Sequence, residues 1–279
     1  MILIADSGST KTIWKCTDGA GKVKTAYTAG INPYYNNAEE VAKEVSEAGT
    51  QLTGMHIEEV YFYGAGCSTD NQKGIVSKAL TKQFGSEVIS INTDLLGAAR
   101  ALFQKGSGIV CILGTGSGSC IYDGDKILKS IPSLGFILGD EGSGAFLGKQ
   151  FIRDFLREDM PEDLHKIMNE EIGIDKEEVL KHVNQDAMPS KYLAGFSKYI
   201  HEYLDHKYMH DLVYSSFENF VQEYVIRYDD FRNFKIGFIG SISVIYEKIL
   251  KEVLDNYQLE LGKIEANPIE GLIEYHLSQ

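Results

Sequence analysis

The sequence is poor in cysteine, short of positive charge and without a long apolar run. Its four cysteines, Cys16, Cys67, Cys111 and Cys120, lie far apart and form no CxxC pair. This pattern argues against a disulfide framework or a zinc knuckle and favours reduced thiols. Lys and Arg number 27 against 40 Asp and Glu, which gives a net charge of −13. Nucleic acids and anionic membranes attract cationic surfaces, so this charge argues against both as partners.

Apolar segments are too short for membrane insertion or export. The run Ile109–Leu113 falls far below the ~20 residues that span a bilayer. The run Ile2–Ala5 is too short for a signal peptide and lacks its basic start. We therefore expect a cytoplasmic protein. The 279 residues, of which 43% are hydrophobic, suffice for roughly two domains with buried cores.

Two stretches follow the same plan of strand, glycine-rich turn, strand, Asp-Gly turn and strand. Gly8 occupies the glycine-rich turn of the first copy, and Gly116 occupies that of the second. The plan predicts a three-stranded antiparallel meander, and its repetition predicts two similar domains. The strands expected in the first copy cover residues 1–6, 11–17 and 22–28, and those in the second cover 108–114, 119–122 and 126–131.

Between the two copies, strands and helices alternate. Strands are expected at 58–66 and 87–92, and helices at 38–52, 71–84 and 94–104. The last helix begins after a cap at Asn92 or Thr93. This alternation predicts an α/β sheet with parallel members and helices packed on it.

The second half is mostly helical between residues 144 and 230. A strand at 234–240 and a helix at 241–257 follow, and Pro268 begins a closing helix that ends near residue 277. The amphipathic segments expected in the helical region cover 151–156, 163–172, 176–183 and 191–228.

Four glycine-rich polar stretches follow strands or lie beside them. Loops of this kind let backbone amides approach phosphate oxygens, although each one alone is more simply explained as a plain turn. The loops at Gly8 and Gly116 are stronger evidence together, because corresponding loops of duplicated domains would face each other and hold a triphosphate from both sides. The four stretches are Asp6–Thr12, Gly114–Ser119, Gly139–Gly144 and Gly240–Ser241.

Common nucleotide and zinc signatures are not met. The segment GAFLGKQ resembles a P-loop, but Gly144 and Gly148 are one residue too close and Gln150 replaces Ser or Thr. The segment HEYLDH, His201–His206, has one residue too many for an HExxH zinc pair. We interpret it as a solvated helix surface.

Three aspartates lie at strand ends or in adjacent loops, where α/β sheets bind ligands. A lone buried charge at Asp6 costs several kcal/mol unless it is paired or bound to a metal, so Asp6 is a candidate to position Mg²⁺ through water. Asp94 either supplements a helix cap or accepts a proton from a hydroxyl substrate. Asp140 and Glu141 are enclosed by glycines in GDEGSG, which favours a shaped site over an ordinary surface loop. A metal, amide donors and a carboxylate base are what phosphoryl transfer needs.

The motifs DSGSTKT, NTDLLGAARA, LGTGSGS, GDEGSG and GFIGSI, in this order, resemble the N-acetylglucosamine kinase family. This group includes the BadF/BadG-type ATPases and belongs to the sugar kinase–actin superfamily. The resemblance implies an α/β fold with two ribonuclease H-like domains and an interdomain cleft, the actin-like ATPase or sugar kinase fold. The first domain would comprise residues 1–106 joined by the closing helix at about 267–279. The second would comprise residues 107–266 with a helical insertion.

The resemblance also implies roles for individual residues. Asp94 matches the general base that acts on the sugar 6-hydroxyl, and Asp6 would serve the Mg–phosphate end. Gly240 and Ser241 would border the adenine. The other phosphate-binding residues would be Gly8, Ser9, Thr10, Lys11, Gly114, Thr115, Gly116 and Ser117. The sugar-binding residues would be Asn32, Asp94, Gly135 and Asp140.

Three positions depart from the family pattern. Ser7 stands where glycine is common, Leu134 precedes Gly135 where relatives often carry tryptophan, and Glu270 replaces a small residue. The departure at Leu134 implies a different sugar pocket.

We expect an ATP-dependent amino-sugar kinase that uses ATP and Mg²⁺ and phosphorylates N-acetylglucosamine at the 6-hydroxyl. Its expected partners are the amino sugar and ATP, without nucleic acid or membrane. Three alternatives stay open: a glucosamine kinase, an activator ATPase of a reductase or dehydratase, and a non-catalytic sugar sensor. The activator would need thiolates near a dimer axis, whereas the cysteines here fall in or beside expected core strands. The sequence does not decide whether the protein forms a homodimer. It also does not decide whether the sugar substrate carries an N-acetyl group.

Overall fold

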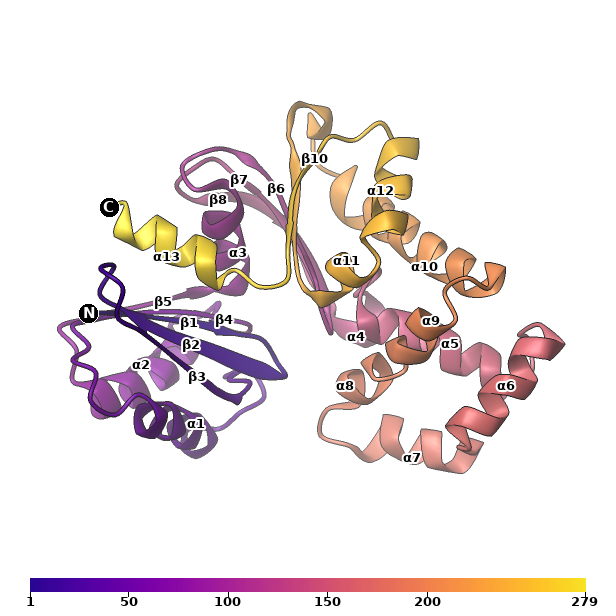
Figure 1. Ribbon diagram of the computed structural model, residues 1–279, viewed down its shortest axis with the longest axis horizontal. Helices are drawn as coiled ribbons and strands as arrows, with labels where there is room; N and C mark the ends of the chain where they lie inside the picture. The colour runs from indigo at the N-terminus through magenta and orange to yellow at the C-terminus, as the bar shows by residue number, and fades with distance from the viewer. The chain divides into compact units, whose positions relative to one another are not determined.

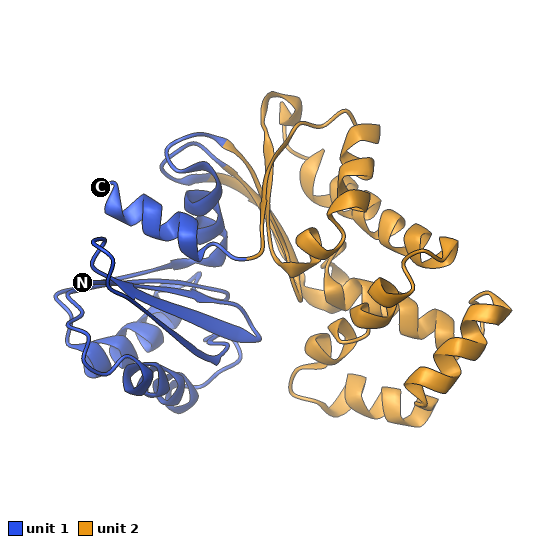
Figure 2. Cartoon of the chain, viewed as in Figure 1, with its two compact units in different colours: residues 1–107, 122–127, 267–279 blue, residues 108–121, 128–266 orange.

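The computed structural model describes all residues from Met1 to Gln279, which divide into two compact units (Figure 2). Each unit contains one five-stranded sheet covered by helices (Figure 1). Unit 1 comprises Met1–Ser107, Tyr122–Ile127 and Asn267–Gln279, and unit 2 comprises Gly108–Ile121 and Leu128–Ala266.

The sheet of unit 1 has the strand order β3-β2-β1-β4-β5. Its first three strands pair antiparallel, which confirms the expected meander, and β4 and β5 continue the sheet in parallel with β1. The strands are β1 (Ile2–Ser7), β2 (Lys11–Thr17), β3 (Val23–Ala29), β4 (Glu59–Gly64) and β5 (Val88–Thr93).

Helices cover both faces of this sheet. On one face, α1 (Ala38–Gln51) and α2 (Asp70–Phe84) enclose a core that includes Leu3 and Ala5. On the other face, α3 (Asp94–Phe103) and α13 (Ile269–Leu277) enclose a smaller core around Ile4. Side chains alternate between the faces of a strand, so Asp6 lies on the same face as Ile4, toward α3 and α13.

The sheet of unit 2 has the order β10-β9-β6-β7-β8. Read from β8, this is the order of unit 1, so the duplication includes two strands beyond each meander. β9 lies parallel to both β6 and β10. The edge strand β10 was not anticipated, because three of its five residues are exposed and its sequence, LGKIE, has no continuous apolar run. The strands are β6 (Gly108–Leu113), β7 (Ser117–Tyr122), β8 (Ile127–Ile131), β9 (Ile236–Ile239) and β10 (Leu261–Glu265).

A large set of helices packs in unit 2 around one core of aromatic and aliphatic side chains. The P-loop-like segment lies inside α5, where Gly148 allows the backbone of α8 to approach: a Cβ there would lie 1.8 Å from the Leu193 carbonyl oxygen. The α-helices are α4 (Gly135–Leu138), α5 (Gly144–Leu156), α6 (Glu162–Ile172), α7 (Lys176–Gln185), α8 (Pro189–Ala194), α9 (Ser197–Glu202), α10 (Lys207–Phe220), α11 (Ser241–Ile245) and α12 (Glu247–Asn256). A π-turn, η1 (Val221–Val225), and a 3₁₀ turn, η2 (Phe231–Asn233), complete the set.

The expected amphipathic segment at 191–228 comprises several helices, and the expected single helix at 241–257 is wrong. The segment 191–228 is divided into α8, α9, α10 and η1, and α8 ends at Ala194 with Gly195 as its C-cap. The segment 241–257 breaks at Tyr246, whose buried side chain donates a hydrogen bond to the Ser197 carbonyl oxygen at 2.8 Å. Anchoring to another element overrides the local preference to continue a helix.

All four cysteines are buried and none forms a disulfide bond. None of the helices combines the length and the apolar character that crossing a bilayer requires.

Candidate active site

The carboxyl ends of three parallel strands in unit 1 lie at one level. Ser7 is paired with Gly64, and Gly64 is paired with Thr93. Asp94 follows as the first residue of α3, and its carboxylate accepts a hydrogen bond from the Leu95 amide at 2.8 Å. The helix cap itself is Thr93, which accepts from the Leu96 amide at 3.3 Å. Asp94 is therefore not required as the cap of α3.

Two half-buried carboxyl groups, those of Asp6 and Asp94, interact at this edge of the sheet. Partial burial and the neighbouring Asp94 together raise the pKa of Asp6 to about 7, and Lys11 opposes the rise. Burial also raises the pKa of Asp94, while the Leu95 amide lowers it. The Cys67 thiol lies in the same field, because Asp94 adds to the burial that raises its pKa to about 12. Cys67 was not identified from the sequence, where it had no motif.

The first glycine loop is closed by a hydrogen bond from the Gly8 amide to the Lys11 carbonyl oxygen at 3.1 Å. A Cβ on Gly8 would meet only that oxygen, at 3.9 Å, and Gly8 lies outside the left-handed region. We would expect a side chain at a glycine-rich turn to obstruct it, but at Gly8 a side chain would not clash within the chain. Since the fold does not require glycine here, the position leaves room for a ligand to approach the backbone.

The side chains behind this loop hold it in place. Ser7 is fully buried; its hydroxyl bonds with the Thr12 hydroxyl at 2.7 Å and with both backbone groups of Ile31 at 2.8 and 3.0 Å. A Cβ on Gly30 would lie 2.3 Å from the Gly8 carbonyl oxygen. The fold therefore needs the hydroxyl of Ser7, the departure noted above, to anchor the segment after β3.

Asn32 lies in that segment and is 7% exposed. Its carboxamide oxygen accepts from the Tyr34 amide at 3.0 Å, and its amide nitrogen donates to the Ser9 hydroxyl at 3.4 Å. Gly66, after β4, is in the left-handed region, and a Cβ on it would lie 2.0 Å from the Asn32 oxygen. Asn32 therefore links the first glycine loop to the ends of the parallel strands.

In unit 2, the second glycine loop is held by the start of α5. The amides of Gly144 and Ala145 donate to the carbonyl oxygens of Gly114 and Thr115 at 2.8 and 3.1 Å. The first amides of a helix have no partner within the helix, so here the loop supplies their acceptors. A Cβ on Gly114 would meet no atom within 4 Å. Like Gly8, this glycine is not required by the surrounding chain.

The Asp140 carboxylate stabilises the same loop by accepting a hydrogen bond from it. It is 6% exposed and has a φ of 60°, a strained conformation for a residue other than glycine. Its carboxylate accepts from the Ser117 amide and the Ser133 hydroxyl, both at 3.3 Å. Burial raises the pKa of Asp140, and these two donors lower it. The hydroxyl of Ser117 is buried without a hydrogen-bond partner, which leaves one polar group of the loop available to a ligand.

The π-turn η1 brings Tyr224 to this loop. The Ile226 amide bonds to the Val221 carbonyl oxygen at 3.0 Å, and the Tyr224 carbonyl accepts instead from the Ser119 hydroxyl at 2.7 Å. A Cβ on Gly139 would lie 3.2 Å from the Tyr224 hydroxyl. Single π-turns inside helices are frequent at functional sites. The sequence carried no signal for Tyr224, because its spacing was that of an ordinary amphipathic helix.

Of the two remaining glycines expected in the site, Gly240 has no room for a side chain and Gly135 has room for one. Gly240, between β9 and α11, has a φ of 128°, and a Cβ there would lie 2.2 Å from the Leu113 carbonyl oxygen. Only glycine therefore fits at position 240, where the end of β9 lies against the end of β6. The exposed Ser241 follows directly. Gly135 begins α4 with a φ of 72°, and a Cβ there would meet nothing within 4 Å.

For a divalent cation, the donors in unit 1 are carboxylates. No group of three or more His, Cys, Asp or Glu side chains is arranged to hold a metal ion. Mg²⁺ is commonly held by one or two carboxylates together with substrate phosphates and water. Asp6 fits that mode, because a cation beside it would relieve the cost of ionising a buried carboxyl group that shares its surroundings with Asp94.

Two sheets with one strand order, each with a glycine loop at the ends of its strands, define the two-domain fold of actin-like ATPases and sugar kinases. The MreB5 protein of Spiroplasma citri bound to ADP shares this fold, with a TM-score of 0.62 and 12% identity over 99% of this chain and 95% of that one. Within this class, residues 5–207 match the model of the BadF/BadG/BcrA/BcrD ATPase family. The chain belongs to that family.

Two relatives are similar in sequence. A proposed N-acetylglucosamine kinase of Porphyromonas gingivalis is 40% identical, with a TM-score of 0.95 over 100% of this chain and 99% of that one. The N-acetyl-D-glucosamine kinase of Dictyostelium discoideum is 25% identical over 168 residues, or 54% of this chain. The matched part spans only 53% of the Dictyostelium protein.

Proposed function

We propose that this chain is an ATP-dependent amino-sugar kinase that transfers the γ-phosphoryl group of ATP to the 6-hydroxyl of N-acetylglucosamine. The observation that carries the proposal is Asp94: a half-buried carboxyl group that begins α3, is not needed as its cap and lies beside Asp6. Membership of an ATPase family and the likeness to the Porphyromonas protein support the nucleotide and the sugar class.

In the proposed reaction, Asp94 is the general base. Its carboxylate accepts the proton of the 6-hydroxyl while the sugar oxygen bonds to the γ-phosphorus. The bond between the γ-phosphorus and the bridging oxygen breaks, and ADP leaves with that oxygen. Burial makes Asp94 more basic than an exposed aspartate, which brings the base closer to the working pH.

The two glycine loops are proposed to bind the phosphates. In unit 1 these residues are Gly8, Ser9, Thr10 and Lys11, and in unit 2 they are Gly114, Thr115, Gly116 and Ser117. Asp6 would hold Mg²⁺, which supplies positive charge to the phosphates when it is bound. Gly240 and Ser241 are proposed to border the adenine. Asn32, Gly135 and Asp140 are proposed to contact the sugar, with the Asp140 carboxylate shared between that role and its bonds to Ser117 and Ser133.

The burial of the cysteines supports the kinase over the activator-ATPase alternative. Cys16 and Cys111 are fully buried in the two main cores, and burial raises the pKa of both thiols. A cluster shared across a dimer needs accessible thiolates. An iron-dependent visible absorption band after anaerobic purification would favour the activator over the kinase.

The direct experiment compares ADP release by wild type and Asp94→Asn with N-acetylglucosamine, glucosamine and glucose. We expect Asp94→Asn to lower kcat by about 10²–10⁴-fold, since it removes the base but keeps the shape of the side chain. Phosphorus NMR of the product would identify the 6-phosphate. The ratio of kcat/KM for N-acetylglucosamine and glucosamine would settle the acyl preference.

A matched control is Asp70→Asn. Asp70 is also the first residue of a helix, follows a capping threonine and lies in the same unit, but its side chain is exposed. It should leave kcat unchanged. Undiminished turnover in Asp94→Asn would remove Asp94 from its role, and sugar binding without ATP turnover in wild type would favour the sensor.

A further inference from the structure

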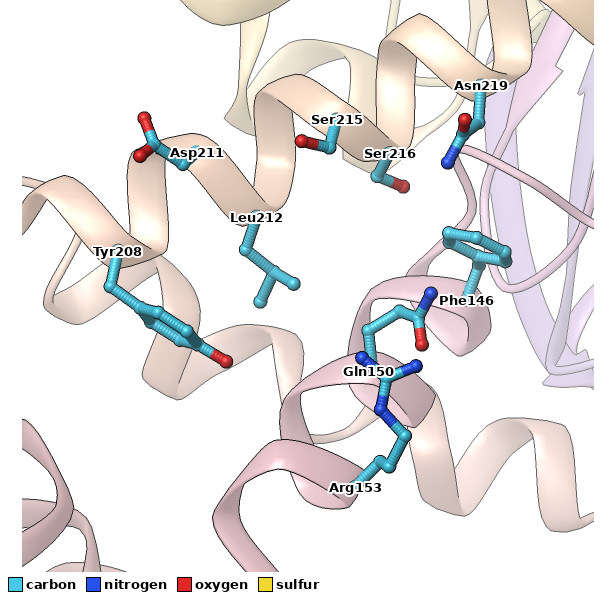
Figure 3. Close-up of a pocket in the computed structure, with 9 residues that line it drawn as sticks. All are labelled: Phe146, Gln150, Arg153, Tyr208, Asp211, Leu212, Ser215, Ser216 and Asn219. Carbon is cyan, nitrogen blue, oxygen red and sulfur yellow. The ribbon is translucent and has the colours of Figure 1, made fainter. Parts of the chain in front are cut away.

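A cavity of about 270 Å³ lies between α5 and α10 in unit 2, outside the residues discussed above (Figure 3). Helix α5 contributes Phe146, Gln150 and Arg153, at helical spacings of four and three residues. The stripe of α10 that faces them includes Leu212, Ser216 and Asn219. A seam between two packed helices is normally apolar, whereas most side chains on this one are polar.

Ser216 is the central observation. It is 2% exposed, and its hydroxyl has no hydrogen-bond partner in the protein. In Figure 3 this hydroxyl points into the space bounded by Gln150 and Phe146. A buried hydroxyl without a partner costs about 1–3 kcal/mol. An occupant of the cavity that bonds to Ser216 would remove this cost.

Three neighbours offer further hydrogen-bonding capacity. The side chains of Gln150, Ser215 and Asn219 line the cavity, and none of them forms a hydrogen bond with another group of the protein. Together with Ser216 they present two carboxamides and two hydroxyls, all of which can donate and accept hydrogen bonds. Hydroxyl groups on a ligand match them best, because a hydroxyl also donates and accepts hydrogen bonds.

The charged residues around the cavity are already paired. Arg153 forms two contacts with the carboxylate of Asp154 at 2.7 Å, and Asp211 is paired with Lys207. No unpaired charge of either sign remains to select an ionic ligand. Phe146 and Leu212 supply an apolar wall, as the carbon-bound faces of a sugar ring require.

From this combination we infer that the cavity between α5 and α10 is a second binding site, and that its ligand is an uncharged polyhydroxylated molecule of monosaccharide size. The volume lies below the roughly 300 Å³ at which pockets for drug-sized ligands begin, so the ligand is limited to about one sugar ring. The site is independent of the proposed kinase chemistry, since none of its residues carries a proposed catalytic role.

The test uses three uncharged probes, D-glucose, N-acetyl-D-glucosamine and myo-inositol, and one charged probe, N-acetylglucosamine 6-phosphate. Binding is measured by titration calorimetry on the full chain, for wild type, Gln150→Ala and Ser216→Ala. We expect at least one uncharged probe to bind with an affinity that each substitution lowers by about tenfold. Asp94→Asn should not affect this binding, which separates it from the candidate active site.

Two readouts distinguish a ligand site from a structural role. Ser216→Ala should leave the melting temperature unchanged or raise it, because it removes an unpaired hydroxyl. The control is Asn256→Ala on the neighbouring α12, where the Asn256 side chain donates to the Tyr214 hydroxyl of α10; this variant should leave probe binding unchanged. Turnover with ATP should be retained in Gln150→Ala.

The inference is overturned if no uncharged probe binds in a way that depends on Gln150 and Ser216, or if only the charged probe does. A crystal soaked with the best probe should show it bonded to Ser216. Density for water alone at that position would also overturn the proposal.

Discussion

Asp6 and Asp94 are both aspartates, and the surroundings of each raise its pKa above the ordinary value. Both are half-buried at the carboxyl ends of parallel strands, and the charge of Asp94 disfavours ionisation of Asp6. We predict that Asp94→Asn lowers the pKa of Asp6 below about 7 in the metal-free protein, because the neutral amide removes a like charge. Carbon NMR titration of the labelled carboxyl groups measures this. An unchanged midpoint would show that the two groups do not interact.

Gly8 and Gly30 provide a matched pair of glycine substitutions. A Cβ on Gly8 meets only one atom, at 3.9 Å, whereas a Cβ on Gly30 would lie 2.3 Å from the Gly8 carbonyl oxygen. Gly8→Ala should therefore fold normally and raise the KM for ATP, because its methyl group would occupy the space proposed for phosphate. Gly30→Ala should lower the free energy of unfolding by about 1–3 kcal/mol. Thermal melts and ATP kinetics separate the two, and an unchanged KM for Gly8→Ala would count against phosphate at this loop.

At the scale of single elements, the π-turn after α10 determines where Tyr224 lies. The side chain is 3% exposed, packs on Phe220 with ring centroids 5.1 Å apart, and places its hydroxyl against the segment that contains Asp140. We predict that Tyr224→Phe lowers kcat about five- to tenfold, because it removes a polar contact worth about 1 kcal/mol behind the second glycine loop. Steady-state kinetics with varied ATP would show whether kcat or KM changes.

Tyr228→Phe is the control for that variant. The Tyr228 hydroxyl accepts from the Ile131 amide at 3.1 Å and bonds with the Ser119 hydroxyl at 2.7 Å. Its loss should reduce stability without a selective effect on turnover. If both variants lost stability equally and kept full turnover, Tyr224 would be only a packing residue.

Helix α13 joins unit 1 through a histidine that is kept neutral. His276 stacks on Tyr61, with ring centroids 3.6 Å apart, and its Nε2 bonds with the Tyr63 hydroxyl at 2.8 Å. Burial lowers the pKa of His276 from 6.5 to about 4, and the Arg100 guanidinium adds to this. Glu270 on the same helix pairs with Lys15 of β2, which gives this departure from the family pattern a partner at the surface.

The pH dependence of stability follows from the direction of that shift. Between about pH 6.5 and pH 4 the unfolded chain binds a proton at His276 that the folded chain does not, so stability falls as the pH falls through this range. Asp6 acts in the opposite direction, because its raised pKa adds stability as the pH falls below about 7, so urea unfolding of wild type and His276→Gln is compared at pH 7.5 and pH 5. On going from pH 7.5 to pH 5, His276→Gln should lose less stability, or gain more, than wild type, because the variant has no group to titrate there. A difference as large as that of wild type would exclude His276 as the cause.

At the scale of the whole molecule, the sequence predicted the duplication from its hairpins. Apolar runs separated by a glycine-rich turn and an Asp-Gly turn predicted three strands of each copy, and the common order of all five strands followed from the structure. The helices of unit 2 were less predictable. Their breaks at Gly195 and Tyr246 depend on contacts such as that between Tyr246 and Ser197, which lie far apart along the chain.

Local patterns were therefore sufficient for every strand except β10, for the glycine loops and for the family, because periodicity and turn chemistry depend on neighbouring residues. The interaction of Asp6 with Asp94, the bracing of Ser117 by Asp140, the approach of Tyr224 and the cavity at Ser216 became apparent from the folded chain. Each of these joins residues from different elements. Burial and proximity of that kind arise when strands and helices pack, and no window of the sequence contains them.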